Sequence, residues 1–168
     1  MRRLVSTLLI WLSGVLSAQD FGAKTQVSLL VEPATAKAGD TIDVALHLKM
    51  PDGWHTYWRN AGENGTPTSI SWTLPKGITA GEILWPKHSV VELFGKKANV
   101  YERQVMLLAR LRVGKGGAAG DYEIGLKVDW QECDPEICVP QDKEFKLTLK
   151  VGAEAKLAGA PKEFDAWL

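Results

Sequence analysis

The sequence of 168 residues predicts an all-β protein, built as a sandwich of two antiparallel β-sheets. Segments in which polar and apolar residues alternate recur along the chain, and this period of two is typical of strands with one buried face. Turn-forming residues separate the segments, and no amphipathic stretch long enough for a major helix occurs before residue 152. Many short strands at this spacing favour an immunoglobulin-like antiparallel β-sandwich.

Six segments are expected to form strands. In chain order they are TQVSLLVE (25–32), TIDVALHLK (41–49), TSISWTL (68–74), RQVMLLARLRV (103–113), DYEIGLKVDWQ (121–131) and KEFKLTLKV (143–151). Breakers such as PATAKAGD, NAGENGTP and GKGGAAG separate them, because Gly, Pro, Asn and Asp favour the backbone angles of turns. The chain shows no internal repeat, so residues 19–152 are expected to form a single domain.

The amino terminus has the layout of a secretory signal peptide. Two arginines precede an apolar run from Leu4 to Leu16, and small residues follow before Gln19. Residues 1–18 are therefore expected to be a signal peptide that is cleaved after Ala18. The run is shorter than the about 20 residues that span a membrane, so the remaining protein is expected to be exported and soluble. Residues 153–168, rich in Ala, Lys and Glu, are expected to form a tail with a short helix or a frayed end.

The charge balance argues against binding to nucleic acid or to anionic lipid. The chain has 20 basic and 20 acidic residues, and removal of Arg2 and Arg3 with the signal peptide leaves 18 against 20, a net charge of −2. A protein or a small molecule is the expected partner. The sequence contains no Ser-His-Asp order, Gly-rich phosphate loop or paired carboxylates that would indicate a hydrolase or a nucleotide-binding protein.

The stretch WQECDPEICVPQD, residues 130–142, contains the only two cysteines of the sequence, Cys133 and Cys138. In an exported protein two nearby cysteines are expected to form a disulfide. A purely structural role is the first interpretation. A bridge that closes so short a loop constrains little of the unfolded chain, however, and contributes only about 2 kcal/mol. The pair is therefore poorly placed to serve as a structural cross-link.

The alternation of residues 121–131 favours a reactive pair instead. The even-numbered apolar positions from Tyr122 to Trp130 share one face of the strand, and the odd-numbered polar ones share the other. Cys133 continues the polar face, and Cys138 also falls outward if the register holds through Val139 and Pro140. Both sulfur atoms are therefore expected at the sheet surface, away from the core.

Negative charge surrounds the cysteine pair in the sequence. Glu132, Asp134 and Glu136 lie beside the cysteines, and the loop contains no Lys or Arg that would lower the pKa of a thiol. A thiol whose pKa stays near or above the reference value of about 8.5 is less ionised at neutral pH but intrinsically more nucleophilic. This suits a relay that exchanges electrons with a docked partner rather than a strong oxidant.

These residues resemble a known family. The stretch WQECDPEICVPQD is similar to the active-site hairpin of the amino-terminal periplasmic domain of the thiol:disulfide interchange reductase DsbD, with Trp130, Gln131, Cys133, Cys138 and Pro140 matching its pattern. The segment VELFGKKANVYERQVMLLARL (91–111) resembles the family's cap-loop segment, and MPDGWHTYWRNAGENGTPTSISWTLPKGITAGEILWP (50–86) resembles the first half of its domain. The resemblance covers most of residues 25–151.

The resemblance implies a periplasmic domain that exchanges thiols and disulfides, a component of protein-disulfide reduction. Electrons would pass from a thioredoxin-like donor to oxidised exported proteins through Cys133 and Cys138, with no metal or organic cofactor. Cys138 would form the mixed disulfide with the partner, and Cys133 would resolve it. A monomer is expected, and the acceptor is left open among an isomerase, a cytochrome-maturation thioredoxin and a peroxidase. Because the sequence ends soon after the domain, the donor is expected to be another protein, and docking of the exported domain on a membrane reductase is left open.

The family's cap over the disulfide corresponds to the segment from Glu92 to Gly95. Leu93 and Phe94 are the two bulky apolar residues of this segment, and Gly95 supplies unusual backbone angles. We expect Leu93 or Phe94 to pack over the cysteines and to swing away when a partner docks. The alternative is that Phe94 fills the end of the sandwich core.

The segment WHTYW adds candidate neighbours of the disulfide. In the family, tyrosines of this segment lie beside the cysteines, which makes His55 and Tyr57 candidates here. Trp54 and Trp58 are expected to pack in the core or on the sheet. Exposed tryptophans on a secreted β-sandwich also suit a second function, a carbohydrate-binding or protein-binding module with a structural disulfide. A metal site is not expected, because the three histidines are scattered along the sequence.

Overall fold

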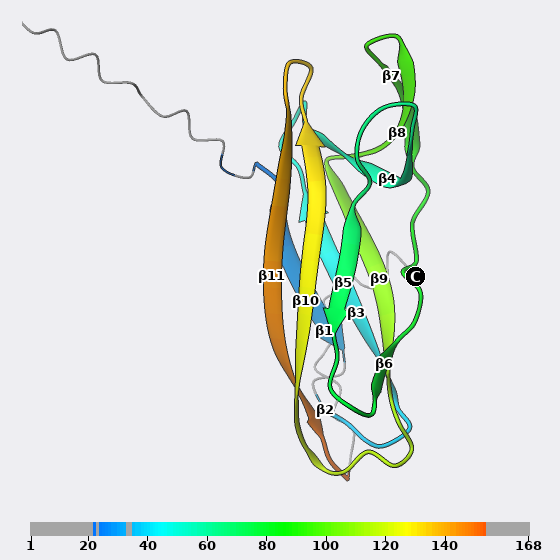
Figure 1. Ribbon diagram of the computed structural model, residues 1–168, viewed down its shortest axis with the longest axis vertical. Helices are drawn as coiled ribbons and strands as arrows, with labels where there is room; N and C mark the ends of the chain where they lie inside the picture. The colour runs from blue at the N-terminus through cyan, green and yellow to red at the C-terminus, as the bar shows by residue number, and fades with distance from the viewer. Residues whose placement is uncertain (1–21, 23, 33–34, 154–168) are drawn as a thin grey trace, which may run out of the picture.

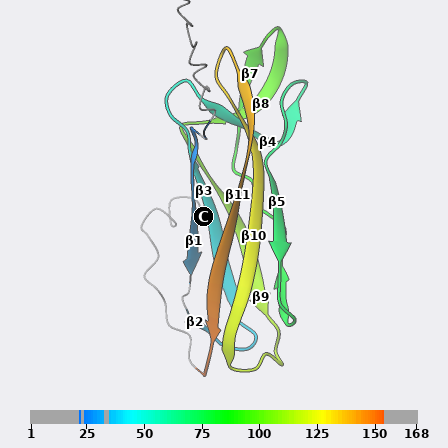
Figure 2. The ribbon, with the colours of Figure 1, turned by 60° about the vertical axis from the view of Figure 1, so that its left-hand side comes forward.

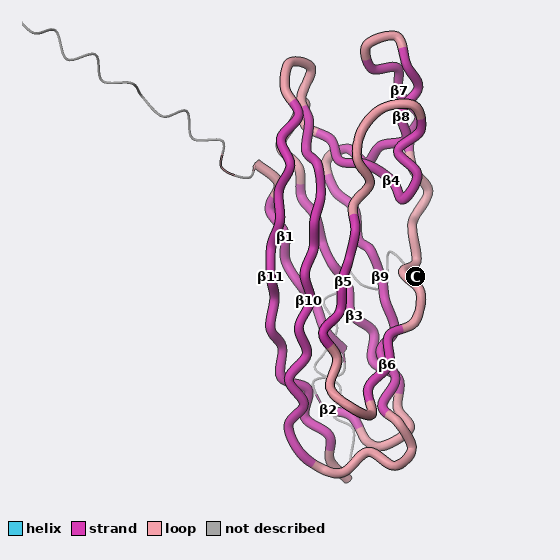
Figure 3. Tube along the Cα trace, in the orientation of Figure 1, coloured by secondary structure: helices cyan, strands magenta, loops and turns pink. Residues whose placement is uncertain are grey.

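The computed structural model describes residues 22, 24–32 and 35–153. The all-β prediction is confirmed, because these residues form eleven strands and no helix (Figure 3). The described part of the chain accordingly holds no helix that would cross a membrane. The expected signal peptide, residues 1–18, and the expected tail beyond Ala153 lie outside the described residues.

The strands form two sheets packed face to face, as Figures 1 and 2 show from two directions. The first sheet has the order β1-β3-β9-β6, and the second has the order β2-β11-β10-β4-β8-β7, with β5 also paired to β10. Neighbouring described strands are antiparallel, except that β2 runs parallel to β11. The bounds are β1 (Gln26–Glu32), β2 (Thr35–Ala36), β3 (Thr41–Lys49), β4 (His55–Gly62), β5 (Ser69–Thr73), β6 (Ile78–Ala80), β7 (Ser89–Leu93), β8 (Lys96–Glu102), β9 (Gln104–Val113), β10 (Gly120–Cys133) and β11 (Cys138–Val151).

All six predicted strands are present in the structure. Strand β3 has the predicted bounds, β1 and β9 each begin one residue later than predicted, and β5 is one residue shorter at each end. Strands β10 and β11 are longer than predicted, because their pairing continues to the two cysteines without a bulge. Strands β2, β4, β6, β7 and β8 are not predicted by the alternation along the sequence. The first and third of these are two and three residues long, and the register of β4 against β8 shifts between Tyr57 and Gly62, so no simple alternation marks it.

Apolar side chains from both sheets form the core between them. The even-numbered residues of β3 and those of β10 from Ile124 to Trp130 point inward and are buried, as the alternation of β10 predicted: Ile42, Val44, Leu46, Leu48, Ile124, Leu126, Val128 and Trp130. Complete burial of one such side chain contributes about 1.5–3 kcal/mol. This core therefore fixes which face of β10 is turned outward along its length.

A separate cluster closes the end of the sandwich where β4, β8 and β10 meet. Its buried members are Tyr57, Ala61, Ala98, Val100 and Cys133. The half-buried Val91 and Leu93 of β7 pack against it. Figure 1 shows the β7–β8 and β10–β11 hairpins projecting from this same end of the molecule. The cysteine pair thus lies at the end of the sandwich, with Cys133 packed against β4, β7 and β8, three strands that the alternation did not predict.

Candidate functional site

The candidate site is the tip of the β10–β11 hairpin. Cys133, the last residue of β10, lies directly opposite Cys138, the first residue of β11, and the two form a disulfide. Asp134 orders the loop between them. Its Oδ1 accepts hydrogen bonds from the backbone N–H groups of Glu136 and Ile137, each at 2.8 Å. These two bonds, followed by the nearby His55, hold the pKa of the Asp134 carboxyl below its usual value.

The two cysteines differ sharply in exposure. Cys138 is exposed, whereas Cys133 is only 1% exposed. The expectation that both sulfur atoms lie at the surface is therefore wrong for Cys133. Its side chain follows the outward face of β10, but at this end of the strand that face is covered by the cluster from β4 and β8. Alternation along one strand cannot show that another strand covers its outer face.

Tyr57 and His55 of β4 lie at the disulfide, as the resemblance implied. The Tyr57 hydroxyl is 3.2 Å from Cys133 Sγ and 4.0 Å from Cys138 Sγ. His55 Nε2 is 3.3 Å from the same hydroxyl, and the two rings meet edge to face with centroids 5.3 Å apart. Both side chains are buried. A continuous line of polar atoms thus runs from the imidazole to the buried sulfur.

Burial shifts the pKa values of both side chains away from the charged form. It raises the pKa of the Tyr57 hydroxyl, which therefore keeps its proton at neutral pH. Burial also lowers the pKa of His55 below 6.5, while the negative charges of Glu102 and Asp134 oppose that shift. The site accordingly holds a neutral tyrosine beside a histidine that takes up a proton only in mildly acidic solution.

The loop between β4 and β5 fixes the Tyr57 ring. Gly65 has a φ of +96°, and a Cβ atom at this position would lie inside the ring of Tyr57. The backbone N–H of Thr66 then donates a hydrogen bond of 2.8 Å to Gln131 Oε1, which attaches the loop to β10. Glycine is required here both for the backbone angle and for the close approach to the ring.

The cap segment forms the turn of the β7–β8 hairpin. Leu93 pairs with Lys96, and the two residues between them, Phe94 and Gly95, have φ values of +53° and +75°. Positive φ at both central residues is the pattern of a type I′ turn. Leu93 packs against the cluster that contains Cys133, whereas Phe94 is 73% exposed. The alternative in which Phe94 fills the end of the core is therefore wrong.

The other predicted neighbours have different positions. Glu92 is exposed and lies opposite Lys97 in the β7–β8 hairpin. Gln131 uses its side-chain oxygen for Thr66, and its carbonyl accepts a 3.0 Å hydrogen bond from Thr56 Oγ1. Pro140 is exposed and lies opposite Gln131 in the ladder. Gln131 thus attaches the hairpin to the loop between β4 and β5, and Pro140 faces solvent beside it.

Glu132 has a structural role that sequence reasoning missed. It is completely buried, and its two carboxylate oxygens accept hydrogen bonds of 2.7 Å from the backbone N–H groups of Lys24 and Thr25. The indole of Trp130 and the amide of Gln141 donate to it at 3.4 and 3.3 Å. Glu132 was expected among the charges around the thiols, but it is an even-numbered residue of β10 and therefore lies on the inward face. Its place in the alternation of β10 is the sequence feature that could have predicted its burial.

The remaining aromatic and histidine residues do not gather at one site. Trp54 and Trp58 are half-buried against the main core, as the packing interpretation predicted. His88 stacks on Trp58 with ring centroids 4.1 Å apart, and His47 contacts Gln104 at 3.1 Å. The three histidines therefore lie in three different environments, and among the described residues no three potential metal ligands gather.

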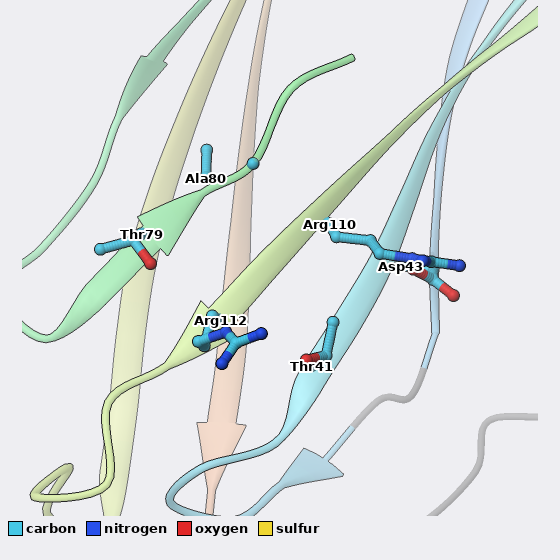
Figure 4. A pocket seen from close by; sticks show the side chains of 7 residues that line it. Thr41, Asp43, Thr79, Ala80, Arg110 and Arg112 are labelled. Carbon is cyan, nitrogen blue, oxygen red and sulfur yellow. Dashed lines mark hydrogen bonds and ion pairs between the residues drawn. The ribbon is translucent and has the colours of Figure 1, made fainter. Parts of the chain in front are cut away.

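A surface hollow on the first sheet lies apart from the disulfide. It is lined by residues of β3, β6 and β9 with Gly81, and none of them belongs to the cluster around Cys133. Figure 4 shows Arg110 beside Asp43, and the guanidinium donates a hydrogen bond of 2.9 Å to that carboxylate. This ion pair is on the surface, where such pairs contribute little. The hollow is not part of the candidate site.

The fold and the site together define an immunoglobulin-like domain with a disulfide at the end of its sandwich, one cysteine buried and one exposed. The model of the family "Thiol:disulfide interchange protein DsbD, N-terminal" matches residues 26–150. The chain belongs to this family, as the sequence resemblance implied.

Two solved structures illustrate the likeness. The N-terminal periplasmic domain of ScsB from Proteus mirabilis has 20% sequence identity and a TM-score of 0.60, over 89% of this chain and 53% of that one. The chain thus spans about half the length of that structure. The reduced DsbD N-terminal domain of Neisseria meningitidis has 19% identity and a TM-score of 0.41, over 77% of this chain and 88% of that one. No curated protein sequence matches the chain significantly.

Replacing Gly65 with Ala should displace Tyr57. Gly53→Ala is the matched control, because Gly53 has a similar φ of +82° but open space where a Cβ would lie. Both variants place an L side chain at positive φ, which costs on the order of 1–2 kcal/mol. Only Gly65→Ala adds the collision with Tyr57, and overpacking of this kind typically costs about 1–3 kcal/mol more. Urea unfolding of the oxidised proteins measures the difference. Equal losses in the two variants would show that the loop moves aside freely.

Proposed function

We propose that this protein is a periplasmic thiol-disulfide exchange domain. It relays electrons from a thioredoxin-like donor to oxidised exported proteins, through a Cys133–Cys138 pair that cycles between dithiol and disulfide. Membership of the DsbD amino-terminal family supports the reaction class. The observation that carries the proposal is the unequal exposure of the pair, with Cys138 exposed and Cys133 buried against Tyr57.

The unequal exposure assigns the two cysteines different steps. A partner thiolate reaches the exposed Cys138 and forms a bond with its sulfur. The bond between Cys138 and Cys133 breaks at the same time, and its electron pair leaves on the Cys133 sulfur. The partner becomes bound to Cys138 as a mixed disulfide. A second partner thiolate then attacks the partner sulfur of that bond, which releases the oxidised donor and leaves the domain as a dithiol. Delivery to an oxidised protein follows the same steps in reverse.

Exposed apolar side chains lie on the two hairpins at the end of the sandwich that carries Cys138, and they suit a protein partner. Ile137 is 40% exposed at the tip of the β10–β11 hairpin, and Val90 is 61% exposed on the β7–β8 hairpin that projects from the same end (Figure 1). Phe94 adds a third such side chain, at a positive φ that a bulky residue adopts only at a cost. Apolar residues presented around a reactive group are typical of a docking surface. The proposed partners are thioredoxin-like domains that bind a monomer of this protein.

The cap segment is proposed to control access to the disulfide. Leu93 is the covering residue, because it packs against the cluster that contains Cys133. Phe94 and Gly95 form the turn beside it, and Glu92 lies on its exposed side. Because Cys133 is covered, an unrelated thiol can attack the disulfide only at Cys138, and an exposed Phe94 offers the partner a contact with which to move the segment. No cofactor takes part in this scheme.

Single cysteine variants test the division of roles. Cys133→Ser should trap thioredoxin-like partners as mixed disulfides, because Cys138 stays exposed and no second thiol resolves the bond. Cys138→Ser should trap few, because Cys133 is buried. The partner is a thioredoxin whose resolving cysteine is replaced by serine and whose remaining cysteine is activated as a mixed disulfide with thionitrobenzoate, which leaves when the domain's thiolate attacks. Nonreducing electrophoresis after mixing measures the trapped fraction. Equal trapping by the two variants would contradict the assignment.

The reduction potential separates an exchange domain from a module with a structural disulfide. Structural disulfides of secreted proteins typically have potentials below about −300 mV. The proposed function requires a value above that bound, which equilibration with glutathione or dithiothreitol buffers measures. A value well below −300 mV would favour the second interpretation, a β-sandwich that binds carbohydrate or protein.

Alanine variants of the cap separate covering from docking. Leu93→Ala should speed reduction by dithiothreitol severalfold, because it opens the cluster around Cys133, with a stability loss of about 1–2 kcal/mol for a half-buried leucine. Phe94→Ala should leave that rate nearly unchanged and slow reduction by a thioredoxin-like protein. Glu82→Ala, an exposed change outside the hairpin, is the control for both. If Leu93→Ala leaves the small-thiol rate unchanged and lowers stability, Leu93 is only a packing residue.

A further inference from the structure

A line of polar atoms lies behind the disulfide. His55, Tyr57 and Cys133 come from two adjacent strands, with Cys133 directly opposite His55 in the β4–β10 pairing. Their contacts of 3.3 and 3.2 Å join a titratable imidazole to the buried sulfur through a single hydroxyl. All three side chains are at least nine-tenths buried. Water therefore has little access to the sulfur that must gain or lose a proton.

We propose that Tyr57 and His55 form a proton relay for Cys133. The inference rests on the proposed exchange function and adds two positioning residues to it. Cys138 faces solvent and can exchange its proton with water, whereas Cys133 is enclosed by the cluster. An enclosed thiolate is costly in an apolar environment, so a nearby hydrogen-bond donor and a proton source lower the barrier to its release.

The relay supplies the proton that the Cys133 sulfur takes up in the exchange step. When a thiolate attacks Cys138, the electron pair of the broken disulfide leaves on Cys133 Sγ. The Tyr57 hydroxyl donates its proton to that sulfur and receives the proton of a charged His55 Nε2, so that the products are a thiol, a tyrosine and a neutral imidazole. The reverse step returns the proton to His55 when Cys133 attacks a mixed disulfide at Cys138. The imidazole regains or loses its proton by exchange with solvent between turnovers.

The surroundings of His55 fix the direction of the pH dependence. His55 contacts the uncharged Tyr57 and lies opposite Cys133. The charged groups that face it are Glu102 of β8 and Asp134 of the hairpin loop. Both favour the imidazolium, but burial outweighs them and keeps the pKa of His55 below 6.5. The proton-donating form is therefore lost as the pH rises through a value below 6.5. Tyr57 holds its own proton over this range, because burial raises its pKa above 10.

The test is the reduction of the oxidised protein by dithiothreitol between pH 4.5 and 8, with each rate divided by the concentration of dithiothreitol thiolate. The corrected rate of the unmodified protein should fall with rising pH, with its midpoint below 6.5. The fall should be about tenfold, less than the usual 10²-fold or more of general acid catalysis, because a thiolate is already a good leaving group. His55→Gln and Tyr57→Phe should give flat profiles. His47→Gln, the same change at a buried histidine of the other sheet, should keep the fall.

Each result decides the proposal. Identical pH profiles of the corrected rate in all four proteins would overturn the relay. If Tyr57→Phe keeps the decrease of the corrected rate with rising pH, the Tyr57 hydroxyl does not carry the proton. If the two variants do not fold, the unmodified protein still provides a test, because proton transfer predicts a slower reaction in heavy water below the midpoint. No such solvent isotope effect would overturn the relay. Dithiothreitol needs no partner protein, so the relay and the exchange function, which partner trapping tests, can fail separately.

Discussion

The structure depends on the uninterrupted pairing of β10 with β11. Fourteen residue pairs, from Gly120 and Val151 to Cys133 and Cys138, continue from one end of the sandwich to the other. Because side chains alternate along both strands, the same ladder that places Leu126 in the core also fixes the orientation of the cysteines. A slip of one residue would expose the core face and turn the disulfide over. The hydrophobic core thus holds the reactive group in register.

The edge of β10 that does not pair with β11 determines which side chains surround the cysteines. Strand β5 pairs with Gly125–Asp129, and β4 takes over at Glu132 and Cys133. This change of partner places β4 and β8 beside β10 only at its end, where their side chains cover its outward face. One sulfur is enclosed there, while the hairpin turn leaves the other exposed. An ordinary change of strand partner therefore produces two chemically different sulfur atoms from a symmetric covalent bond.

Buried polar groups at the end of β10 are paired on both faces. On the inward face, Glu132 accepts hydrogen bonds from the backbone N–H groups of the two residues before β1. On the outward face, the Tyr57 hydroxyl contacts Cys133 Sγ. A buried carboxylate is costly unless it is hydrogen-bonded, so the first set of contacts ties the start of β1 to the strand that carries the disulfide. The outward face holds His55, Tyr57 and the disulfide. The hydrogen bonds of the inward face thus anchor the strand end that carries the reactive sulfur.

The sequence by itself determined the all-β class, the position of strand β3, the inward face of β10 and the identity of the cysteine pair, because these follow from alternation and composition along single segments. It also placed Cys138 outward correctly, since the register continued through Pro140. Only the tertiary structure decided that Cys133 is buried, that Phe94 is exposed and that Gly65 packs on Tyr57. Each of these depends on a contact between β4, β8 or a loop and another element. Local periodicity indicates which face of a strand a residue takes, but not what other parts of the chain place upon that face.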